Sequence, residues 1–336
     1  MLAVILWVIP KTSSRPDSRL GLADGPERND GRNDRHGGDS VPSRVALVGV
    51  GRMGTPLCGR LVSAGHTVTA FDLRPEREEA VRALGADWAS SVTAAAAGAD
   101  VLVTVVPGPD EAEAALQDAV FSVLASGAVW IDMTSNAPAV AEVLRDRART
   151  HGVDVLEAPV GGSPADAEQG RLRLFVGGSP EVLDRYRPVL EAVTTSDRIS
   201  HMGGPGTGYT TKLLINLLWF GQAAATAEAL LLGRRAGIDL GVLRDTLAGS
   251  AAGSDFIRRD LSALFAGDYL ASYGLDRIHD QLEVITGEAR DLGTPHAIAD
   301  TVLHLHRRAL ERFGPVNGEL LAVALLEEVA GTLLRP

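Results

Sequence analysis

The chain has 336 residues, more than one hydrophobic core normally supports, so its length predicts two domains. Its formal net charge of −11 argues against a nucleic-acid partner, because such proteins concentrate positive charge on one face and the sequence shows no basic stripe. The single cysteine, Cys58, excludes an internal disulfide and a cysteine-based metal site. We therefore expect a reducing, cytoplasmic location and no metal.

The first 43 residues are expected to form a disordered extension. The apolar run at residues 1–10 is too short to span a bilayer and lacks the basic segment that opens a secretory signal. Residues 11–43 are rich in Arg, Asp, Gly, Pro and Ser, so they cannot bury enough apolar surface to offset the entropy of ordering. We expect no membrane-spanning segment in the chain.

From residue 44 to about 205, short apolar runs alternate with helical patterns. This alternation predicts parallel βαβ units, and hence an α/β domain with a doubly wound parallel sheet of the Rossmann type. The expected strands lie at 45–50, 67–72, 101–106, 128–132, 153–157 and 173–176, and the expected helices include 53–64, 75–84 and 137–150.

The remainder, residues 206–336, is expected to be an all-helical domain for substrate binding and dimerisation. It contains no convincing strand pattern, and its Ala/Leu-rich runs are broken at glycines and prolines. One helix is predicted over 209–236, roughly 40 Å long at the standard rise per residue. Its apolar surface exceeds what a small helical domain covers, which predicts a homodimer or higher homo-oligomer.

A glycine-rich turn, Gly49-Val50-Gly51-Arg52-Met53-Gly54, follows the first expected strand and opens a helix. Its glycines suit a tight turn, close approach to a pyrophosphate and helix packing, although a glycine turn without ligand is the alternative. Asp72 ends the next strand, where a carboxylate binds a ribose 2′-hydroxyl, so NAD is favoured; Arg74 could reach a 2′-phosphate, which keeps NADP open. The expected cofactor contacts are Gly49, Gly51, Arg52, Met53, Gly54, Asp72, Leu73, Arg74, Val106 and Pro107.

Only two lysines occur in the chain, Lys11 and Lys212, and all other basic residues apart from histidine are arginines. Arginine cannot release its proton at a workable pH, whereas lysine can when its site lowers its pKa. Lys212 is therefore a candidate for proton transfer, with an ordinary surface lysine as the alternative. Asn216 lies four residues later, on the same face of the predicted helix.

Four segments, taken in order, resemble the β-hydroxyacid dehydrogenases, a family that includes 3-hydroxyisobutyrate dehydrogenase, tartronate semialdehyde reductase and, more distantly, 6-phosphogluconate dehydrogenase. They are the nucleotide-binding segment 45–72, the hydroxyl-rich segment 132–138, the loop 157–164 and the segment 206–216. The resemblance covers Arg44 to about Ala309, nearly all of the predicted fold.

The resemblance implies roles for particular residues. Lys212 falls on the family's catalytic lysine and Asn216 on the asparagine beside it, both contacting substrate. Ser135 falls on the hydroxyl residue that contacts the nicotinamide end and the substrate, although Ser and Asn before a helix also serve as caps. Gly161, Gly162 and Ser163 fall on the loop that holds the substrate carboxylate, but the family's usual Ser-Gly-Gly is here Gly-Gly-Ser.

The sequence departs from the family pattern on a later helix. Where the family usually carries Lys-Asp-Leu, with the lysine near nicotinamide and substrate, this chain carries Asp280-Gln281-Leu282. If Asp280 occupies that place beside the cofactor, it repels a substrate carboxylate unless an arginine such as Arg171 or Arg173 offsets it. A one-residue slip would place His279 there instead, and exposure of Asp280 on the outer helix face is the other alternative.

The resemblance implies an NAD(P)-dependent oxidoreductase that transfers a hydride between the cofactor and a small β-hydroxyacid or its semialdehyde. The small-molecule substrate itself is not specified by the sequence. Two alternatives stay open: an imine or aldehyde reductase on the same scaffold, and a catalytically inactive dinucleotide-binding interaction protein. The retained Lys212 and Asn216 favour the dehydrogenase.

Overall fold

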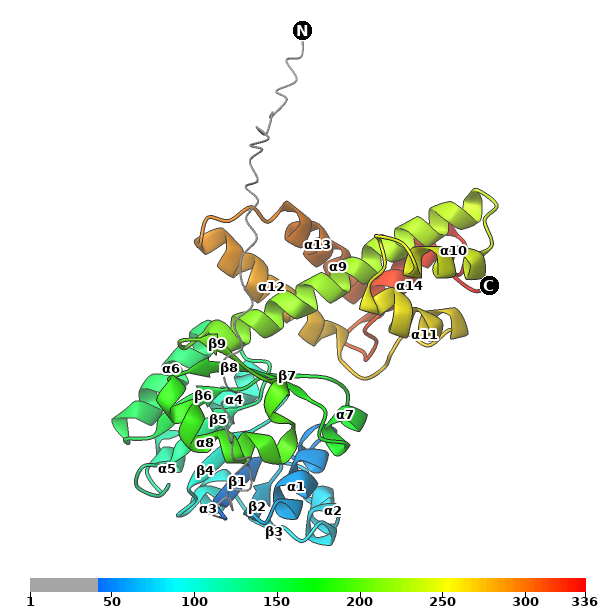
Figure 1. Ribbon diagram of the computed structural model, residues 1–336. Helices are drawn as coiled ribbons and strands as arrows, with labels where there is room; N and C mark the ends of the chain where they lie inside the picture. Colours follow the sequence, from blue (N-terminus) through cyan, green and yellow to red (C-terminus); the bar gives the residue numbers. More distant parts are fainter. Residues whose placement is uncertain (1–41) are drawn as a thin grey trace, which may run out of the picture. The chain divides into compact units, whose positions relative to one another are not determined.

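The computed structural model describes residues 42–336, and its described part begins with a mixed sheet (Figure 1). The predicted extension at 1–43 therefore lies almost wholly outside the described residues. The strand order is β3-β2-β1-β4-β5-β6-β8-β7, with β9 paired to β8. The strands are β1 (Arg44–Val48), β2 (Thr67–Phe71), β3 (Asp87–Trp88), β4 (Val101–Thr104), β5 (Val129–Asp132), β6 (Asp154–Glu157), β7 (Val160–Gly161), β8 (Arg173–Gly178) and β9 (Ile199–Gly203).

The first six strands of this sheet are parallel and have the order of a dinucleotide-binding Rossmann domain. The predicted α/β class is thereby confirmed. Strand β8, however, runs antiparallel to β6 and β7, which the alternation of strands and helices did not indicate. The short strand β3, and β7 and β9, were also not predicted.

Two apolar layers cover the sheet, because successive side chains of a strand point to opposite faces. In β1, Val45 and Leu47 belong to one core cluster, while Ala46 and Val48 belong to the other. The first cluster is covered by α1 (Gly54–Ser63), α2 (Glu78–Ala83), α7 (Pro164–Glu168) and α8 (Pro180–Val193), and the second by α3 (Val92–Ala96), α4 (Pro109–Ala115), α5 (Asp118–Phe121) and α6 (Pro138–Thr150).

The chain after the sheet is helical, as predicted (Figure 1). Helix α9 (Thr207–Arg235) leaves the end of the sheet and packs against α10, α12, α13 and α14. Trp219 on α9 contacts Phe220 and Phe256 edge to face, inside the helical core. The other helices are α10 (Leu240–Ala248), α11 (Leu261–Ala266), α12 (Leu275–Asp291), α13 (Ala297–Phe313) and α14 (Leu321–Ala330).

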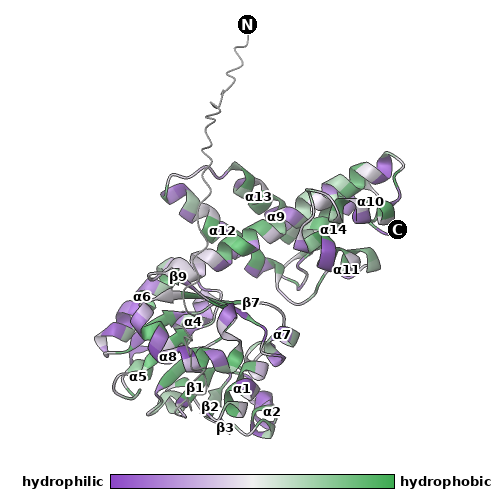
Figure 2. Ribbon diagram, in the orientation of Figure 1, coloured by the Kyte–Doolittle hydropathy of each residue, from purple (hydrophilic) through white to green (hydrophobic). Residues whose placement is uncertain are grey.

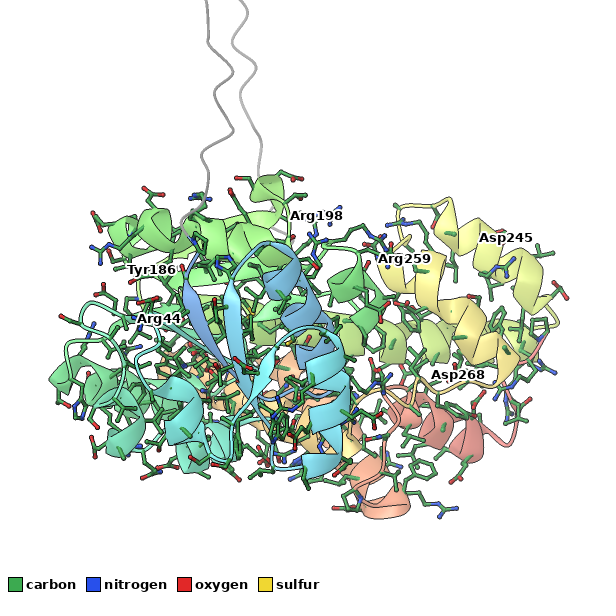
Figure 3. All side chains as sticks on the ribbon, turned by 90° about the horizontal axis from the view of Figure 1, so that it is seen from below. Arg44, Tyr186, Arg198, Asp245, Arg259 and Asp268 are labelled. Carbon is green, nitrogen blue, oxygen red and sulfur yellow. The ribbon has the colours of Figure 1, made fainter. Side chains whose placement is uncertain are left out.

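Hydrophobic residues are abundant along α9, and some remain uncovered (Figure 2). Leu214 is 46% exposed and Leu218 is 63% exposed, four residues apart on one face. Helix α9 is long and apolar enough to cross a membrane by length and composition alone, a property that core helices of soluble proteins share. Charged side chains such as Arg44, Asp245 and Asp268 lie on the surface of both halves (Figure 3).

Candidate active site

The glycine turn has the geometry of a dinucleotide cradle. A Cβ on Gly49, whose φ is +94°, would lie 2.4 Å from the Val105 carbonyl oxygen, and one on Gly54 would lie 1.9 Å from the Gly49 carbonyl oxygen. Both positions therefore require glycine, for the tight turn and for the close approach of α1. A Cβ on Gly51 would meet only the Arg74 side chain, at 3.3 Å, so the backbone there can approach a pyrophosphate.

Beside this turn lies a cavity of about 890 Å³, a volume suited to a cofactor. Its walls include all ten residues from Gly49 to Pro107 that the sequence predicted to contact the cofactor, and also Ser135. The residues that the sequence did not single out are Phe71, Ser90, Ser91, Val92, Glu111, Ala114, Ala115, Met133, Val160, Ser272 and Tyr273, among others. The cavity thus runs from the ribose-binding end of β2 to the helical half of the chain.

Asp72 lies at the predicted ribose position, and Arg74 pairs with it. The Arg74 Nε donates to Asp72 Oδ1 at 2.9 Å and its Nη2 donates to Oδ2 at 3.2 Å, while the Val50 amide also donates to Oδ2 at 2.9 Å. Burial alone would raise the pKa of Asp72, but the hydrogen bonds from Arg74 and Val50 lower it below its usual value. Asp72 is therefore an ionised acceptor at neutral pH.

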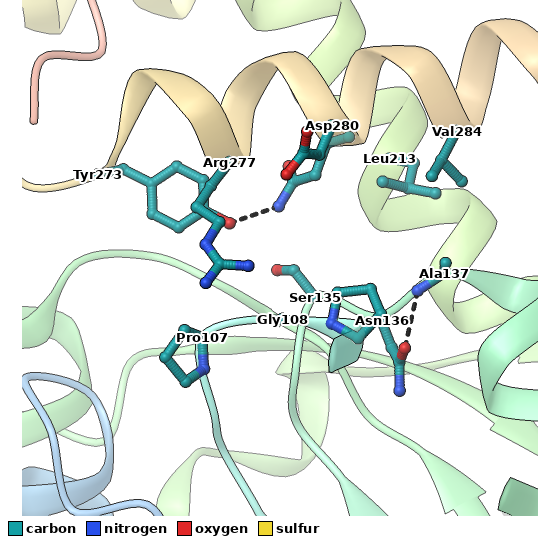
Figure 4. Close-up of a pocket in the computed structure, with 12 residues that line it drawn as sticks. Pro107, Gly108, Ser135, Asn136, Ala137, Leu213, Tyr273, Arg277, Asp280 and Val284 are labelled. Carbon is teal, nitrogen blue, oxygen red and sulfur yellow. Dashed lines mark hydrogen bonds between the residues drawn. The ribbon is translucent and has the colours of Figure 1, made fainter. Parts of the chain in front are cut away.

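A second, small cavity of about 30 Å³ adjoins the first, between the end of β4 and helix α12 (Figure 4). Pro107, Ser135 and Tyr273 line both cavities, so they mark the junction at the carboxyl ends of the strands, where doubly wound sheets bind their ligands. Ser135 does not cap the following helix, because the N-cap of α6 is Ala137, whose amide donates to the Asn136 Oδ1 at 2.9 Å. The alternative that Ser135 serves as a helix cap is therefore not realised in the structure.

Hydrogen bonds to Glu157 at the end of β6 hold the start of α9 against the sheet. Glu157 is buried, and its carboxylate accepts hydrogen bonds from the amides of Gly206, at 2.5 Å, and Gly208, at 3.2 Å. A Cβ on Gly208 would lie 2.6 Å from the Phe175 carbonyl oxygen, which explains the glycine. Burial raises the pKa of Glu157 in spite of these amides and of Arg145, 3.4 Å away.

Lys212 lies on the second turn of α9, and Asn216 lies one turn further. Burial lowers the pKa of Lys212 to about 8, against a smaller opposing effect of the Glu319 carboxylate. Lys212 itself lines neither cavity, but its neighbour Leu213 lines the small one. A lysine with a pKa near 8 can both accept and donate a proton near neutral pH, as general acid–base catalysis requires.

A hydrogen-bonded chain holds Asn216. Its Nδ2 donates to the Gln281 Oε1 at 2.6 Å, and the Gln281 Nε2 donates to the Tyr273 hydroxyl at 2.6 Å. Gln281 is 8% exposed, whereas the Asp280 side chain is 64% exposed and forms part of the small cavity's wall. Of the two polar residues in the Asp280-Gln281-Leu282 segment, it is therefore Gln281 that is buried and orients Asn216.

Glu319, in the segment before α14, is a further residue of the site. Its carboxylate accepts a hydrogen bond from the Ser272 hydroxyl, and Ser272 lines the large cavity. Burial raises the pKa of Glu319 to about 7, Asp260 adds to the increase, and Lys212 and Arg52 oppose it. The sequence did not identify Glu319 as a residue of the site, because no recognisable motif surrounds it.

The loop 161–163 is not brought to either cavity; only its neighbour Val160 lines one. Ser163 is the N-cap of α7, where its hydroxyl donates to Asp166 Oδ2 at 2.7 Å and accepts from the Asp166 amide. Ser163 therefore does not supply the hydroxyl donor that the family's loop has at the position of Gly161, because its hydroxyl is bonded to Asp166. Arg171 pairs with Asp166 at 2.9 Å, and neither Arg171 nor Arg173 lines the small cavity beside Asp280.

Comparison with known proteins agrees with this geometry. Residues 44–203 match the family described as the NAD binding domain of 6-phosphogluconate dehydrogenase, and residues 206–326 match the NAD-binding region of NADP-dependent 3-hydroxyisobutyrate dehydrogenase. A 3-hydroxyisobutyrate dehydrogenase of Pseudomonas aeruginosa is 34% identical over 212 residues, covering 62% of this chain and 70% of its own. An NAD-dependent L-serine dehydrogenase of the same organism is 33% identical over 213 residues, covering 63% and 71%.

Solved structures share the fold. A Mycobacterium tuberculosis 3-hydroxyisobutyrate dehydrogenase superposes with a TM-score of 0.77 at 24% identity, over 85% of this chain and 99% of that one. A Myxococcus stipitatus imine reductase superposes less well, with a TM-score of 0.54 at 25% identity, over 84% and 99%. The nearer likeness is to the dehydrogenase.

The fold, the glycine cradle and the lysine of lowered pKa define an NAD(P)-dependent oxidoreductase of Rossmann and helical architecture. With the relatives above, the chain belongs to the β-hydroxyacid dehydrogenase family. It binds a nicotinamide dinucleotide, for which the cradle, Asp72 and the 890 Å³ cavity provide a fitting site.

Proposed function

We propose that the protein transfers a hydride between NAD and a small β-hydroxyacid or the corresponding semialdehyde. The observation that carries the proposal is the buried Lys212, with a pKa near 8, one helical turn from Asn216, whose amide is held by Gln281 in the wall of the small cavity. A bound nicotinamide dinucleotide would supply or accept the hydride. The relatives act on 3-hydroxyisobutyrate and L-serine according to their names, which makes small hydroxyacids the substrates to test first.

In the oxidative direction, the neutral amine of Lys212 accepts the proton of the substrate hydroxyl. In the reductive direction, the same group as an ammonium polarises the carbonyl and returns the proton. Asn216 orients the substrate oxygen without titrating, because its own amide is fixed by Gln281. Ser135 lines both cavities, which supports a role for its hydroxyl in binding the substrate beside the nicotinamide.

The test is an activity screen with NAD and with NADP. The panel contains 3-hydroxyisobutyrate, L-serine, the corresponding semialdehydes and a cyclic imine, and cofactor absorbance is followed in both directions. Turnover of a hydroxyacid or semialdehyde supports the proposal. Turnover of the imine alone would replace it with the imine reductase alternative.

We further propose a homo-oligomer in the cytoplasm. The uncovered face of α9, with Leu214 and Leu218 exposed, supports association with a second copy of the chain. Cys58 is free and buried, which suits a reducing compartment. Fractionation of cells with a reporter in each compartment tests the location.

A further inference from the structure

One face of α12 lies along the junction of the two cavities. Tyr273, just before the helix, and then Arg277, Gln281 and Val284 line the small cavity at helical spacing. Figure 4 shows the Arg277 guanidinium and the Ser135 side chain facing each other across this space, with the Tyr273 hydroxyl beside them bonded to the Gln281 amide. Among the described residues that line the small cavity, Arg277 is the only cation.

The guanidinium of Arg277 lies against the start of α4, in the connection that follows β4. Its Nη1 is 3.1 Å from the place of a Cβ on Gly108, the residue after Pro107. Its Nη2 donates a hydrogen bond to Oε1 of Glu111 on α4, which lines the large cavity. The pair thus bridges the sheet half and the helical half at the junction itself.

This ion pair leaves part of its hydrogen-bonding capacity unused. The other carboxylate oxygen of Glu111, Oε2, is buried and has no hydrogen-bond partner among the described residues. The Arg277 side chain is 29% exposed and the Glu111 side chain 30%, so both can be reached from the cavities. A guanidinium binds a carboxylate best through two parallel N–H donors, and Glu111 uses one.

Among the described residues that line the two cavities, the other cations are Arg52 and Arg74, both in the large cavity. Arg74 is paired with Asp72, and Arg52, in the glycine turn where a cofactor's pyrophosphate belongs, donates to the Ser272 carbonyl oxygen at 3.5 Å. Lys212 is needed for proton transfer. The loop 161–163 lies away from both cavities.

We propose that Arg277 binds the carboxylate of the substrate. In the absence of substrate the Arg277 guanidinium is bound by Glu111, and the substrate carboxylate displaces Glu111 from it. The positive charge that Asp280 lacks is then supplied three residues earlier on the same face of α12. The inference deepens the proposed function and rests on it for the identity of the substrate class. The site would then select substrates that carry an anionic group.

The test uses two unreactive probes of nearly equal shape, isobutyrate and its neutral counterpart isobutyramide. Their binding to the NAD-loaded protein is measured by calorimetry for the unmutated chain, Arg277→Gln and Glu111→Gln. Arg277→Gln should weaken isobutyrate roughly 10- to 100-fold, the effect of losing a charge-assisted hydrogen bond, and change isobutyramide less than about twofold. Glu111→Gln should tighten isobutyrate, because the competing carboxylate is gone.

Arg290→Gln is the matched control, since Arg290 is on the same helix, 62% exposed, and lies 3.7 Å from Asp300. It should change neither probe. Equal weakening of both probes by Arg277→Gln, weaker isobutyrate binding in Glu111→Gln, or no preference for isobutyrate in the unmutated protein would each overturn the proposal. The binding result is separate from the reaction: a protein that prefers isobutyrate but turns over no hydroxyacid refutes the proposed function and leaves the role of Arg277 intact.

Discussion

The Tyr209 hydroxyl donates a hydrogen bond of 2.8 Å to Asp132 Oδ2, and this contact joins the first turn of α9 to the end of β5. Both residues are buried, and Asp132 also accepts hydrogen bonds from the Thr104 hydroxyl, the Thr134 amide and the Asn136 side chain. Lys212 follows Tyr209 by three residues, and Ser135 follows Asp132 by three. One buried carboxylate therefore positions both the helix that carries Lys212 and the loop that carries Ser135.

Replacing Tyr209 with Phe removes this contact and keeps the ring. Turnover should fall roughly 10- to 100-fold, the cost of a misplacement near 1 Å, while cofactor affinity changes little. The free energy of unfolding should drop by about 1 kcal/mol. Tyr186→Phe is the control, because it loses a 2.6 Å bond to the Gly127 carbonyl away from the site. Unchanged turnover in Tyr209→Phe would show that Lys212 is placed without Asp132.

Cofactor preference is predicted to depend on Asp72. The unmutated enzyme should prefer NAD, and Asp72→Ala should narrow or reverse the preference, because it removes a ribose acceptor and frees Arg74 for a 2′-phosphate. Catalytic efficiencies with NAD and NADP measure this directly. Arg74→Ala in the same background should cancel the gain with NADP. Equal efficiencies in the unmutated enzyme would contradict this role of Asp72.

Association through α9 is predicted to fail when its exposed face is charged. Leu218→Asp places a carboxylate in the middle of the apolar surface, so the mass from light scattering should fall toward that of one chain. Val143→Asp, a similar change at a 53% exposed position of α6, should leave the mass unchanged. A single-chain mass for the unmutated protein would refute the oligomer.

The local sequence was sufficient to predict those helices, strands and turns whose apolar pattern and glycines lie in one uninterrupted segment. The strand β1, the turn Gly49–Gly54 and helix α1 follow one another within twenty residues, so their apolar runs and glycines indicate the cradle directly. Strands β3 and β7 have only two residues each, and most of β9 is exposed, so neither length nor apolar pattern reveals them. They form because neighbouring strands supply their partners.

The substrate side of the site depends on contacts that no spacing encodes. Glu111 and Arg277 are 166 residues apart, and Asn216 and Gln281 are 65 apart. The sequence predicted a role for Asn216 and, by alignment with the family's lysine, for Asp280. Such an alignment compares positions along the chain and does not show which way a side chain points. The helix turns Gln281 inward instead, and only the packed structure shows that Tyr273 and Arg277 share its face.

Lys212→Ala should lower turnover by roughly two to four orders of magnitude, the usual range for general acid–base catalysis, with little change in cofactor affinity. Lys212→Arg should rescue poorly, because a guanidinium keeps the charge but cannot accept a proton. Turnover under saturating cofactor and substrate measures both. Near-normal turnover in Lys212→Arg would leave this residue only an electrostatic role.

The pH dependence of turnover should report the pair of Lys212 and Glu319. Oxidation needs the neutral amine, so its rate should rise with pH and level off above about 8, where burial places the pKa of Lys212; reduction needs the ammonium and should decline over the same range. Burial raises the pKa of Glu319 to about 7, so its carboxylate is charged when Lys212 titrates and stabilises the ammonium.

Glu319→Gln removes that stabilising charge and keeps the side chain's shape. The pKa of Lys212 should then fall further, and the rise of the oxidative rate should move to lower pH. Asp245→Asn, a change to an exposed carboxylate on α10, should leave the profile in place, and Lys212→Ala should remove this pH dependence from the residual activity. A profile that stays fixed in Glu319→Gln, or moves to higher pH, would mean that Glu319 does not set the proton affinity of Lys212.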